Sequence, residues 1–226
     1  MMLDEFEMLV QGYAAFRASY FNGDNELYGK LVEEGQKPKI LMIACSDSRV
    51  DPAIVLGCQP GDLFVVRNVA NLVPPCESDQ GYHGTSAALE FGIKALKIKH
   101  VVLFGHTRCG GIQSLFEVPQ ENKEKLSFIE KWMGLARPAF EKVQQEHTHL
   151  PLEDKITTCE QYSLLNSLEN LMSFDWIREK VETNQLVLHA WYFDIQTGLI
   201  YAHDPHTTIF KPLIQENLQT LTERSS

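Results

Sequence analysis

Two short stretches of the sequence carry side chains that together could bind a metal ion. Cys45 follows an apolar run at 40–43, and His106 and Cys109 follow a second apolar run at 101–104. Each run is typical of a buried parallel strand. If the two strands are neighbours, the three side chains converge at the carboxyl ends of the strands, where open α/β sheets bind their ligands.

Two cysteine sulfurs and one imidazole nitrogen are ligands typical of zinc. Three protein ligands leave a fourth coordination position free, as in catalytic zinc sites, whereas structural sites use four permanent ligands. The glycines at 105, 110 and 111 are expected to allow the tight turn that lets His106 and Cys109 face one point. The pattern predicts one catalytic zinc ion per chain, although Cys45 or His106 taken singly could be an ordinary core residue.

Asp47 and Arg49 lie close to the first ligand and could assist the metal ion. The Asp47 carboxylate can accept a hydrogen bond from a hydroxide on zinc and aim its lone pair, while a paired Arg49 keeps that carboxylate ionised and in place. The two side chains could instead cap the following turn and pair at the surface, which stabilises a fold by only about 0–1 kcal/mol. The three metal ligands nearby favour the catalytic role.

The elements that position these residues predict an α/β fold, with a mostly parallel central sheet flanked by helices. Residues 39–44, 63–66 and 100–104 are predicted strands, and 84–97 has the apolar spacing of an amphipathic helix. A strand, a helix and a strand in this order form a right-handed crossover between parallel strands.

The C-terminal half is predicted to contain helices followed by strands. Residues 120–146 and 152–182 have mostly helical patterns, with prolines as interruptions. Residues 186–194 and 199–203 flank a turn that contains glycine, and this predicts an antiparallel C-terminal strand or hairpin.

The N-terminal residues predict a helical arm over about 1–35. Apolar side chains recur at helical spacing between 3 and 20, and a second short helix is expected at 26–34. The aromatic side of this arm must pack on its own sheet or on a second subunit. We expect a single domain over 1–226.

Composition narrows the possible partners. A net charge of −10 in 226 residues argues against nucleic acid and anionic membranes, because both attract basic surfaces. The acidic first residues lack the pattern of a signal or transit peptide, so a cytoplasmic location is expected. The five cysteines are widely spaced and suggest no disulfide framework. Those not assigned to the metal are expected to be small, mostly buried side chains without a redox role: Cys58, Cys76 and Cys159.

The combined motifs resemble a known zinc signature. Cys45-x-Asp47-x-Arg49, followed by His106-x-x-Cys109-Gly-Gly, is similar to the signature of the β-class carbonic anhydrases. The resemblance extends from about residue 36 to about residue 115 and returns near 189–204. It implies zinc-dependent, reversible hydration of CO₂ to bicarbonate and a proton, by a zinc-bound hydroxide that the Asp47/Arg49 pair orients. It also implies an alternative closed state in which Asp47 is the fourth zinc ligand.

The resemblance further implies a substrate pocket and an oligomer. In relatives of the plant type the glutamine and the aromatic residue of the pocket come from a neighbouring subunit, so a homodimer or a higher even homo-oligomer is expected. The matching substrate-binding positions are Gln36, Ala44, Phe64, Val69 and Phe91.

Two positions depart from the patterns of the family. Phe91 stands where plant-type members usually have tyrosine, so a hydroxyl is missing there. Met42 stands where the bicarbonate-inhibited type has a tryptophan that helps to form a non-catalytic bicarbonate site. Because the missing tryptophan makes that bicarbonate site doubtful, a plant-like, open form with water on zinc is expected.

Other functions remain open at the level of the sequence. The same scaffold could hydrolyse carbonyl sulfide or carbon disulfide, which are linear relatives of CO₂. A non-catalytic zinc module for assembly or sensing would contain metal without hydratase activity. A thiol redox protein is less favoured, because the chain has no Cys-x-x-Cys pair.

Overall fold

The computed structural model describes residues 4–21, 26–77, 81–117 and 127–214. The chain divides into two compact units, Met1–Lys37 and Pro38–Ser226. The first unit contains helices α1 (Glu5–Phe21) and α2 (Leu27–Glu34), which confirms the helices expected there. Within this unit, aromatic rings of α1 pack on Tyr28 of α2.

The second unit is built on a six-stranded sheet with the order β2-β1-β3-β4-β5-β6. The four strands from β2 to β4 are mutually parallel, and β5 and β6 are antiparallel to their neighbours. The predicted sheet with its antiparallel C-terminal part is therefore confirmed. The strands are β1 (Ile40–Cys45), β2 (Leu63–Asn68), β3 (His100–His106), β4 (Val187–Phe193), β5 (Ile200–Asp204) and β6 (Ile209–Pro212).

The C-terminal strands form the predicted hairpin and two further pairings. β4 and β5 do pair as the predicted hairpin, but β4 also pairs in parallel with β3 and so belongs to the central sheet. β6 then adds an edge strand that the sequence pattern did not reveal, because its four residues include a lysine and a proline.

The apolar runs before the metal-binding motifs form the interior of this sheet. Residues 41–44 of β1 and 101–104 of β3 are at most 3% exposed, as expected for parallel strands that are covered on both faces. The two strands pair so that Ala44 lies opposite Phe104. Their carboxyl ends therefore lie at the same edge of the sheet.

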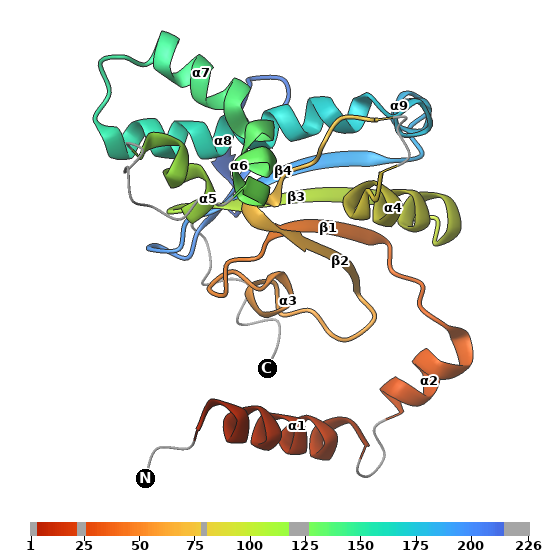
Figure 1. Cartoon of the computed structure of the whole chain (residues 1–226). Helices are drawn as coiled ribbons and strands as arrows, with labels where there is room; N and C mark the ends of the chain where they lie inside the picture. The colour runs from red at the N-terminus through yellow and green to blue at the C-terminus, as the bar shows by residue number, and fades with distance from the viewer. Residues whose placement is uncertain (1–3, 22–25, 78–80, 118–126, 215–226) are drawn as a thin grey trace. The chain divides into compact units, whose positions relative to one another are not determined.

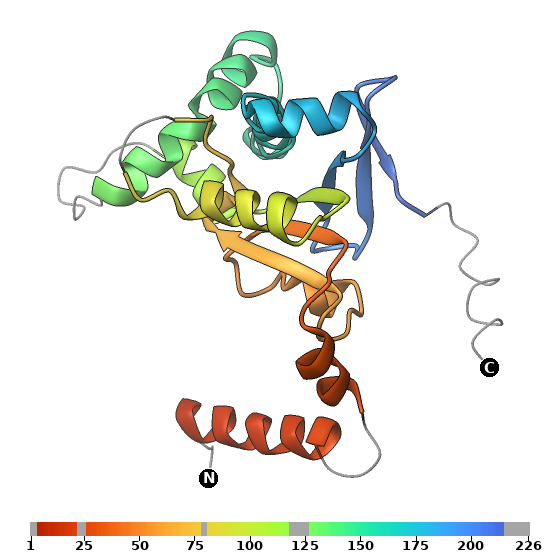
Figure 2. The same ribbon diagram turned by 90° about the vertical axis from the view of Figure 1, so that its right-hand side faces the viewer.

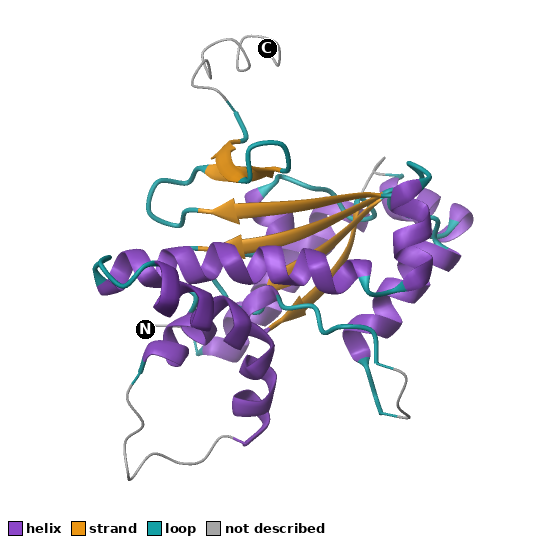
Figure 3. Ribbon diagram, turned by 90° about the horizontal axis from the view of Figure 1, so that it is seen from above, coloured by secondary structure: helices purple, strands orange, loops and turns teal. Residues whose placement is uncertain are grey.

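Helices cover the two faces of the sheet unequally. In Figures 1 and 2, α4 (Gly84–Glu90), α8 (Leu152–Met172) and α9 (Asp175–Glu182) lie on one face, and their apolar side chains form the main core with β1 and β3. Figure 3 looks onto this helical layer with the strands behind it. On the opposite face, the short helix α3 (Pro52–Val55) lies below β1 and β2 in Figure 1.

The helix expected over 84–97 changes its winding part-way. After Glu90 the chain continues as a π-helical turn, Phe91–Ala95, in which the Leu96 N–H donates to the Phe91 carbonyl. Gly92 lies so close to the sheet that a Cβ there would be 2.8 Å from Leu41 Cδ1. The wider turn thus accompanies a close approach of helix and strand that a hydrophobic pattern cannot indicate.

The remaining helices surround the carboxyl end of the sheet. The predicted helical stretches are confirmed where the structure describes them, but the first begins in residues outside the described ranges and the second is divided near Ser173. No described helix has the length and apolar character needed to cross a bilayer. The helices at the carboxyl end of the sheet are η1 (Val69–Asn71), α5 (Gly110–Gln113), η3 (Ser114–Phe116), α6 (Ser127–Met133), η4 (Gly134–Ala136) and α7 (Arg137–Glu146).

Candidate metal centre

The three predicted ligands meet at the carboxyl ends of β1 and β3. Their candidate ligand atoms all lie within 4.8 Å of one another. Cys45 ends β1, His106 ends β3, and Cys109 precedes the first residue of α5. All three residues are at most 4% exposed. The convergence that the two sequence stretches predicted is present.

The turn between His106 and Cys109 does not use glycine in the way expected. Its left-handed residue is Arg108, with φ of 57°. Gly111 instead permits close packing, because a Cβ there would lie 3.0 Å from Val69 Cγ1 and 3.1 Å from Ala70 Cβ. The tight turn is present, but the expectation that its glycines allow it was wrong. The residue with the strained, left-handed backbone is Arg108, which is not a glycine.

His106 has the hydrogen bonding of a metal ligand. Its Nδ1 is 2.8 Å from the carbonyl oxygen of Thr107 and donates to it, so Nε2 is the unprotonated nitrogen. That Nε2 is buried, and it makes no hydrogen bond with any residue that the structure describes. A buried nitrogen without a partner is costly. A metal ion bound beside the two thiols would remove this cost.

The two thiols also suit a dication. A hydrogen bond from the Cys109 thiol lowers the pKa of Cys45, and the same interaction raises the pKa of Cys109. Zinc binds cysteine as the thiolate, so a metal ion at this position would displace the thiol protons. With one imidazole, the donor set is the soft combination of sulfur and nitrogen that selects zinc. The residues present fit a zinc ion.

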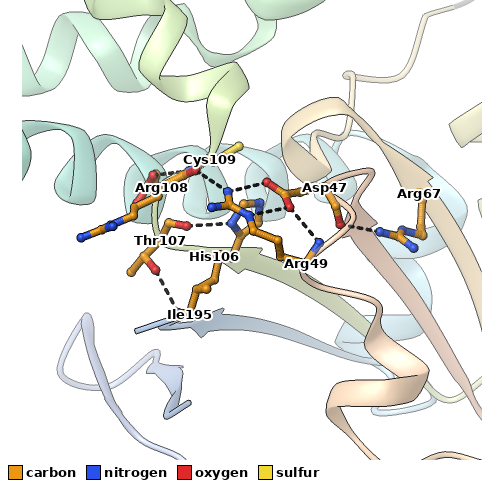
Figure 4. A network of polar contacts seen from close by, with 9 residues as sticks. Asp47, Arg49, Arg67, His106, Thr107, Arg108, Cys109 and Ile195 are labelled. Atoms are coloured by element: carbon orange, nitrogen blue, oxygen red, sulfur yellow. Dashed lines mark hydrogen bonds and ion pairs between the residues drawn. The ribbon is translucent and has the colours of Figure 1, made fainter. Parts of the chain in front are cut away.

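Asp47 and Arg49 form a two-pronged ion pair next to this cluster, as Figure 4 shows. Arg49 Nε donates to Asp47 Oδ1 at 2.9 Å, and Arg49 Nη2 donates to Oδ2 at 2.7 Å. These hydrogen bonds hold the pKa of the Asp47 carboxyl well below its usual range. Both carboxylate oxygens of Asp47 accept hydrogen bonds from Arg49, and Asp47 is not one of the three clustered residues.

Comparison with known proteins agrees with this geometry. A family model described as "Carbonic anhydrase" matches residues 40–200. Beta carbonic anhydrase 5, chloroplastic, of Arabidopsis thaliana is 42% identical over 84% of this chain. The chain belongs to the β-class carbonic anhydrase family. It spans 62% of the length of that Arabidopsis relative.

Solved structures of β-carbonic anhydrases have the same fold. That of the β-carbonic anhydrase CcaA matches with a TM-score of 0.86 and 32% identity, over 95% of this chain and 94% of the other. One of two enzymes described as tetrameric, from the ascomycete Sordaria macrospora, matches with a TM-score of 0.77 and 29% identity, over 88% of this chain and 97% of the other.

Arg67 supports the loop that carries Cys45 and Asp47, a role that the sequence analysis missed. Its Nε donates to the Cys45 carbonyl at 2.9 Å, its Nη2 to the Asp47 carbonyl at 2.7 Å, and its Nη1 to Asp51 Oδ2 at 2.9 Å. Asp51 in turn caps α3 through its other oxygen. The sequence offered no signal for Arg67, because it lies on a different strand of the sheet.

A second missed residue lies behind Cys109. Glu160 of α8 is 3% exposed, and its Oε1 accepts the Cys109 N–H at 2.8 Å. The Tyr192 hydroxyl donates to its other oxygen. Burial raises the pKa of the Glu160 carboxyl to about 7, against the opposing effect of these hydrogen bonds. A glutamate in a helix rich in polar residues is usually solvated, so no pattern in the sequence indicated this role.

Two of the predicted pocket residues lie at the metal end of the sheet. Ala44 immediately precedes Cys45 and is fully buried in a core cluster with Met42 and Phe104. Val69 follows β2, is 37% exposed, and packs close to Gly111 in the turn after Cys109. Its carbonyl accepts a hydrogen bond from Trp132 Nε1 at 2.8 Å.

The other pocket residues do not join the metal cluster of their own chain. Phe64 pairs in register with Leu41, four residues before Cys45, which places it about 13 Å along the strand from that ligand. Phe91 packs beside it, with ring centroids 6.0 Å apart, and is 49% exposed. Gln36 belongs to the N-terminal unit, so its role stays a prediction.

A cavity of about 870 Å³ lies on another side of the turn after β3. Thr107, Arg108 and Tyr192 line it, together with residues from the start of α8 and from the last strands. None of the three metal ligands contributes to its lining.

Proposed function

We propose that the protein catalyses the zinc-dependent, reversible hydration of CO₂ to bicarbonate and a proton. The observation that carries this proposal is the buried cluster of Cys45, His106 and Cys109, with an unpartnered His106 Nε2 and no fourth protein ligand among the described residues. Membership of the β-carbonic anhydrase family supports the choice of substrate.

Each part of the site has a separate task in this reaction. Cys45, His106 and Cys109 would hold the zinc ion, which when bound supplies the Lewis acidity that makes water a nucleophile near neutral pH. The Thr107 carbonyl keeps His106 in the tautomer that presents Nε2. Val69 offers an apolar surface nearby, which suits a linear substrate without charge.

Asp47 would act as a fixed hydrogen-bond acceptor beside the metal. An ionised carboxylate can only accept hydrogen bonds, so Asp47 would orient the proton of a nearby water and leave the lone pair of that water toward CO₂. Arg49 keeps Asp47 ionised through two hydrogen bonds and also donates to the Arg108 carbonyl at 3.1 Å. The pair thus connects the two metal-binding loops.

Stopped-flow hydration of CO₂ with a pH indicator tests the proposal on protein of measured zinc content. We expect activity that is lost when a chelator removes the metal and that returns when zinc is added. Zinc-loaded protein without hydratase activity over a broad pH range would overturn it and indicate a non-catalytic zinc module. Faster release of sulfide from carbonyl sulfide would indicate the alternative hydrolase.

We also propose that the protein acts as a homodimer or a higher even homo-oligomer. Phe64 and Phe91 lie away from their own metal cluster and remain partly exposed, so they are available to complete the site of a second copy. Large apolar side chains of α1 are exposed as well, including Phe6 and Leu9 at 72%. Analytical ultracentrifugation tests the oligomer, and a monomer at micromolar concentration would contradict it.

The cytoplasmic location stays a prediction from the sequence, and cell fractionation with an antibody to the protein tests it. Recovery of the protein in an organelle fraction would contradict it.

A further inference from the structure

The peptide group between Arg108 and Cys109 is held at both of its polar atoms. On one side, Arg49 Nη2 donates to the Arg108 carbonyl at 3.1 Å. On the other side, the Cys109 N–H donates to Glu160 Oε1 at 2.8 Å. The carbonyl and the N–H belong to one rigid, planar unit. Two side chains that are 111 residues apart in the chain, Arg49 and Glu160, thus fix the orientation of one peptide.

This peptide has an intrinsic tendency to rotate away from its observed orientation. Arg108 has a left-handed backbone, with φ of 57°, which costs a non-glycine residue about 1–2 kcal/mol. The peptide leads directly into Cys109, so a rotation would also move the Cys109 sulfur. A strained backbone persists only where surrounding contacts determine it. The hydrogen bond from Cys109 to Glu160 is one such contact.

The opposite end of Glu160 is equally constrained. Tyr192 on β4 is 3% exposed, and its hydroxyl donates to Glu160 Oε2. Tyr192 also lines the 870 Å³ cavity. Glu160 belongs to α8 and is also bound to the sheet through Tyr192. It therefore cannot follow the turn between His106 and Cys109 if that turn moves.

Satisfying one buried N–H does not by itself require a carboxylate. A buried, ionisable side chain carries a desolvation cost that a serine or an amide would avoid. A charge-assisted hydrogen bond is shorter and roughly twice as strong as a neutral one. Glu160 is thus suited to holding a backbone that would otherwise relax.

We propose that Glu160 is a positioning residue for the metal centre. By holding the Arg108–Cys109 peptide, it sets the direction of the Cys109 sulfur and, through the Arg108 carbonyl, the position of the Arg49 guanidinium that pairs with Asp47. The part of this inference that concerns Arg49 and Asp47 rests on the proposed hydratase function. The part that concerns Cys109 requires only that the cluster binds a metal ion.

Zinc affinity and the spectrum of the cobalt-substituted protein test the inference without recourse to activity. Competition with a chromogenic chelator is expected to show zinc binding about 10–100-fold weaker in Glu160→Leu, the usual effect of losing a residue that supports a metal ligand. The sulfur-to-cobalt charge-transfer band is expected to shift in the same variant, because the Cys109 sulfur changes direction. In Glu160→Gln both changes should be smaller than in Glu160→Leu, since an amide oxygen can still accept from Cys109 and its NH₂ can donate to Tyr192, but the hydrogen bond to Cys109 loses its charge.

A control on the same helix separates positioning from general loss of stability. Ser167 is 2% exposed and accepts the Val73 N–H at 3.2 Å, away from the metal ligands. Ser167→Ala removes a buried hydrogen bond of α8 and should leave zinc affinity and the cobalt band unchanged. If it weakens zinc binding as much as Glu160→Leu, the effect belongs to the helix and the inference is wrong.

Further outcomes decide the remaining cases. Unchanged zinc affinity and an unchanged cobalt band in Glu160→Leu would overturn the inference directly. If that variant does not fold, Glu160→Asp decides, because it keeps the charge but withdraws it from Cys109 by one methylene, and weaker zinc binding is expected. A protein that binds zinc normally but does not hydrate CO₂ would refute the proposed function alone, whereas these metal measurements would still apply.

Discussion

The two ends of the central strands differ in how far the chain completes them by itself. At the carboxyl ends of β1 and β3, three metal ligands converge and Arg67 and Glu160 hold their loops from within the same chain. At the opposite end, Phe64 and Phe91 contact each other but lie far along the strand from that cluster. The sequence resemblance assigned both groups to one active site and implied that the aromatic residue comes from a neighbouring subunit, and the fold of one chain assembles only the first group.

The difference between the two strand ends shows which side-chain positions a sequence motif determines. A ligand placed directly after a strand inherits its position from the sheet, so pairing two strands is enough to bring Cys45 and His106 together. A pocket wall on the body of another strand has no such constraint, and in the proposed oligomer a second chain would bring it to the metal. Variants at the two ends test this difference, beginning with the carboxyl ends of β1 and β3.

Removal of one ligand should have the largest effect. His106→Ala deletes the nitrogen ligand and leaves a buried cavity between two thiols. Zinc content should fall to near zero and CO₂ hydration by at least about 10³-fold, since the metal contributes several kcal/mol to the reaction. Metal analysis and stopped-flow assays measure both. The exposed His149 provides the control, because His149→Ala should change neither quantity.

Asp47→Asn should separate the metal from its orienting acceptor. The amide loses the ion pair with Arg49 and presents donors where the proposed role needs an acceptor. We expect kcat/KM for CO₂ hydration to fall by about 10²-fold with full zinc content, in the range of a lost proton-handling group. Asp62→Asn is the control, because Asp62 accepts a backbone N–H in the turn before β2, away from the three clustered residues. Near-normal turnover of Asp47→Asn would remove the orienting role.

These first two variants concern the part of the site that local patterns could predict. The apolar runs before Cys45 and before His106 indicated buried parallel strands, and the order strand, helix, strand indicated their crossover. From that alone the convergence of three ligands followed, and the structure has it. The bidentate pairing of Asp47 and Arg49 was predictable for a similar reason, since two residues of one loop are close by covalent connection.

What the sequence could not predict depends on contacts between distant segments. Arg67 reaches the Cys45 loop across the sheet, and Glu160 reaches Cys109 from a helix 51 residues later, so neither has a local pattern. The strained residue of the second loop is Arg108 rather than a glycine, because long-range hydrogen bonds hold it. The π-helical turn after Glu90 likewise accompanies a long-range contact, the packing of Gly92 on Leu41.

A mixing experiment tests the incomplete end of the comparison. Phe64→Ala should keep its zinc and lose roughly tenfold in kcat/KM, as expected when part of an apolar pocket is removed. If Phe64 serves the site of a neighbouring chain, a hybrid of Phe64→Ala and His106→Ala chains contains one complete site. Refolding the two variants together should then give more activity than the sum of the two alone.

The same hybrid can contradict the assembly. If Phe64 acted within its own chain, no site in the hybrid would have both a metal ion and the phenylalanine, and mixing would give no gain. A gain must also depend on subunit exchange, so mixing the folded proteins at low temperature without refolding serves as the control. Activity that is additive in every case would refute a pocket shared between subunits.

The far edge of the sheet should give the smallest effect and a baseline for the others. Lys211 Nζ lies 2.6 Å from Asp204 Oδ2 in the β5–β6 hairpin, and this hydrogen bond holds the pKa of the Asp204 carboxyl well below its usual range. The pair therefore stabilises the folded state above about pH 4, the usual value for aspartate, and this contribution is lost as the pH falls through the lowered pKa. In Lys211→Met the pKa of Asp204 should rise toward its usual value, which an NMR titration of the carboxyl carbon measures. Zinc content and CO₂ hydration should stay within about twofold of the original protein, because an exposed ion pair contributes little. A large loss of activity in this variant would mean that the β5–β6 hairpin is a third region that the active site requires, in addition to the two ends of the central strands.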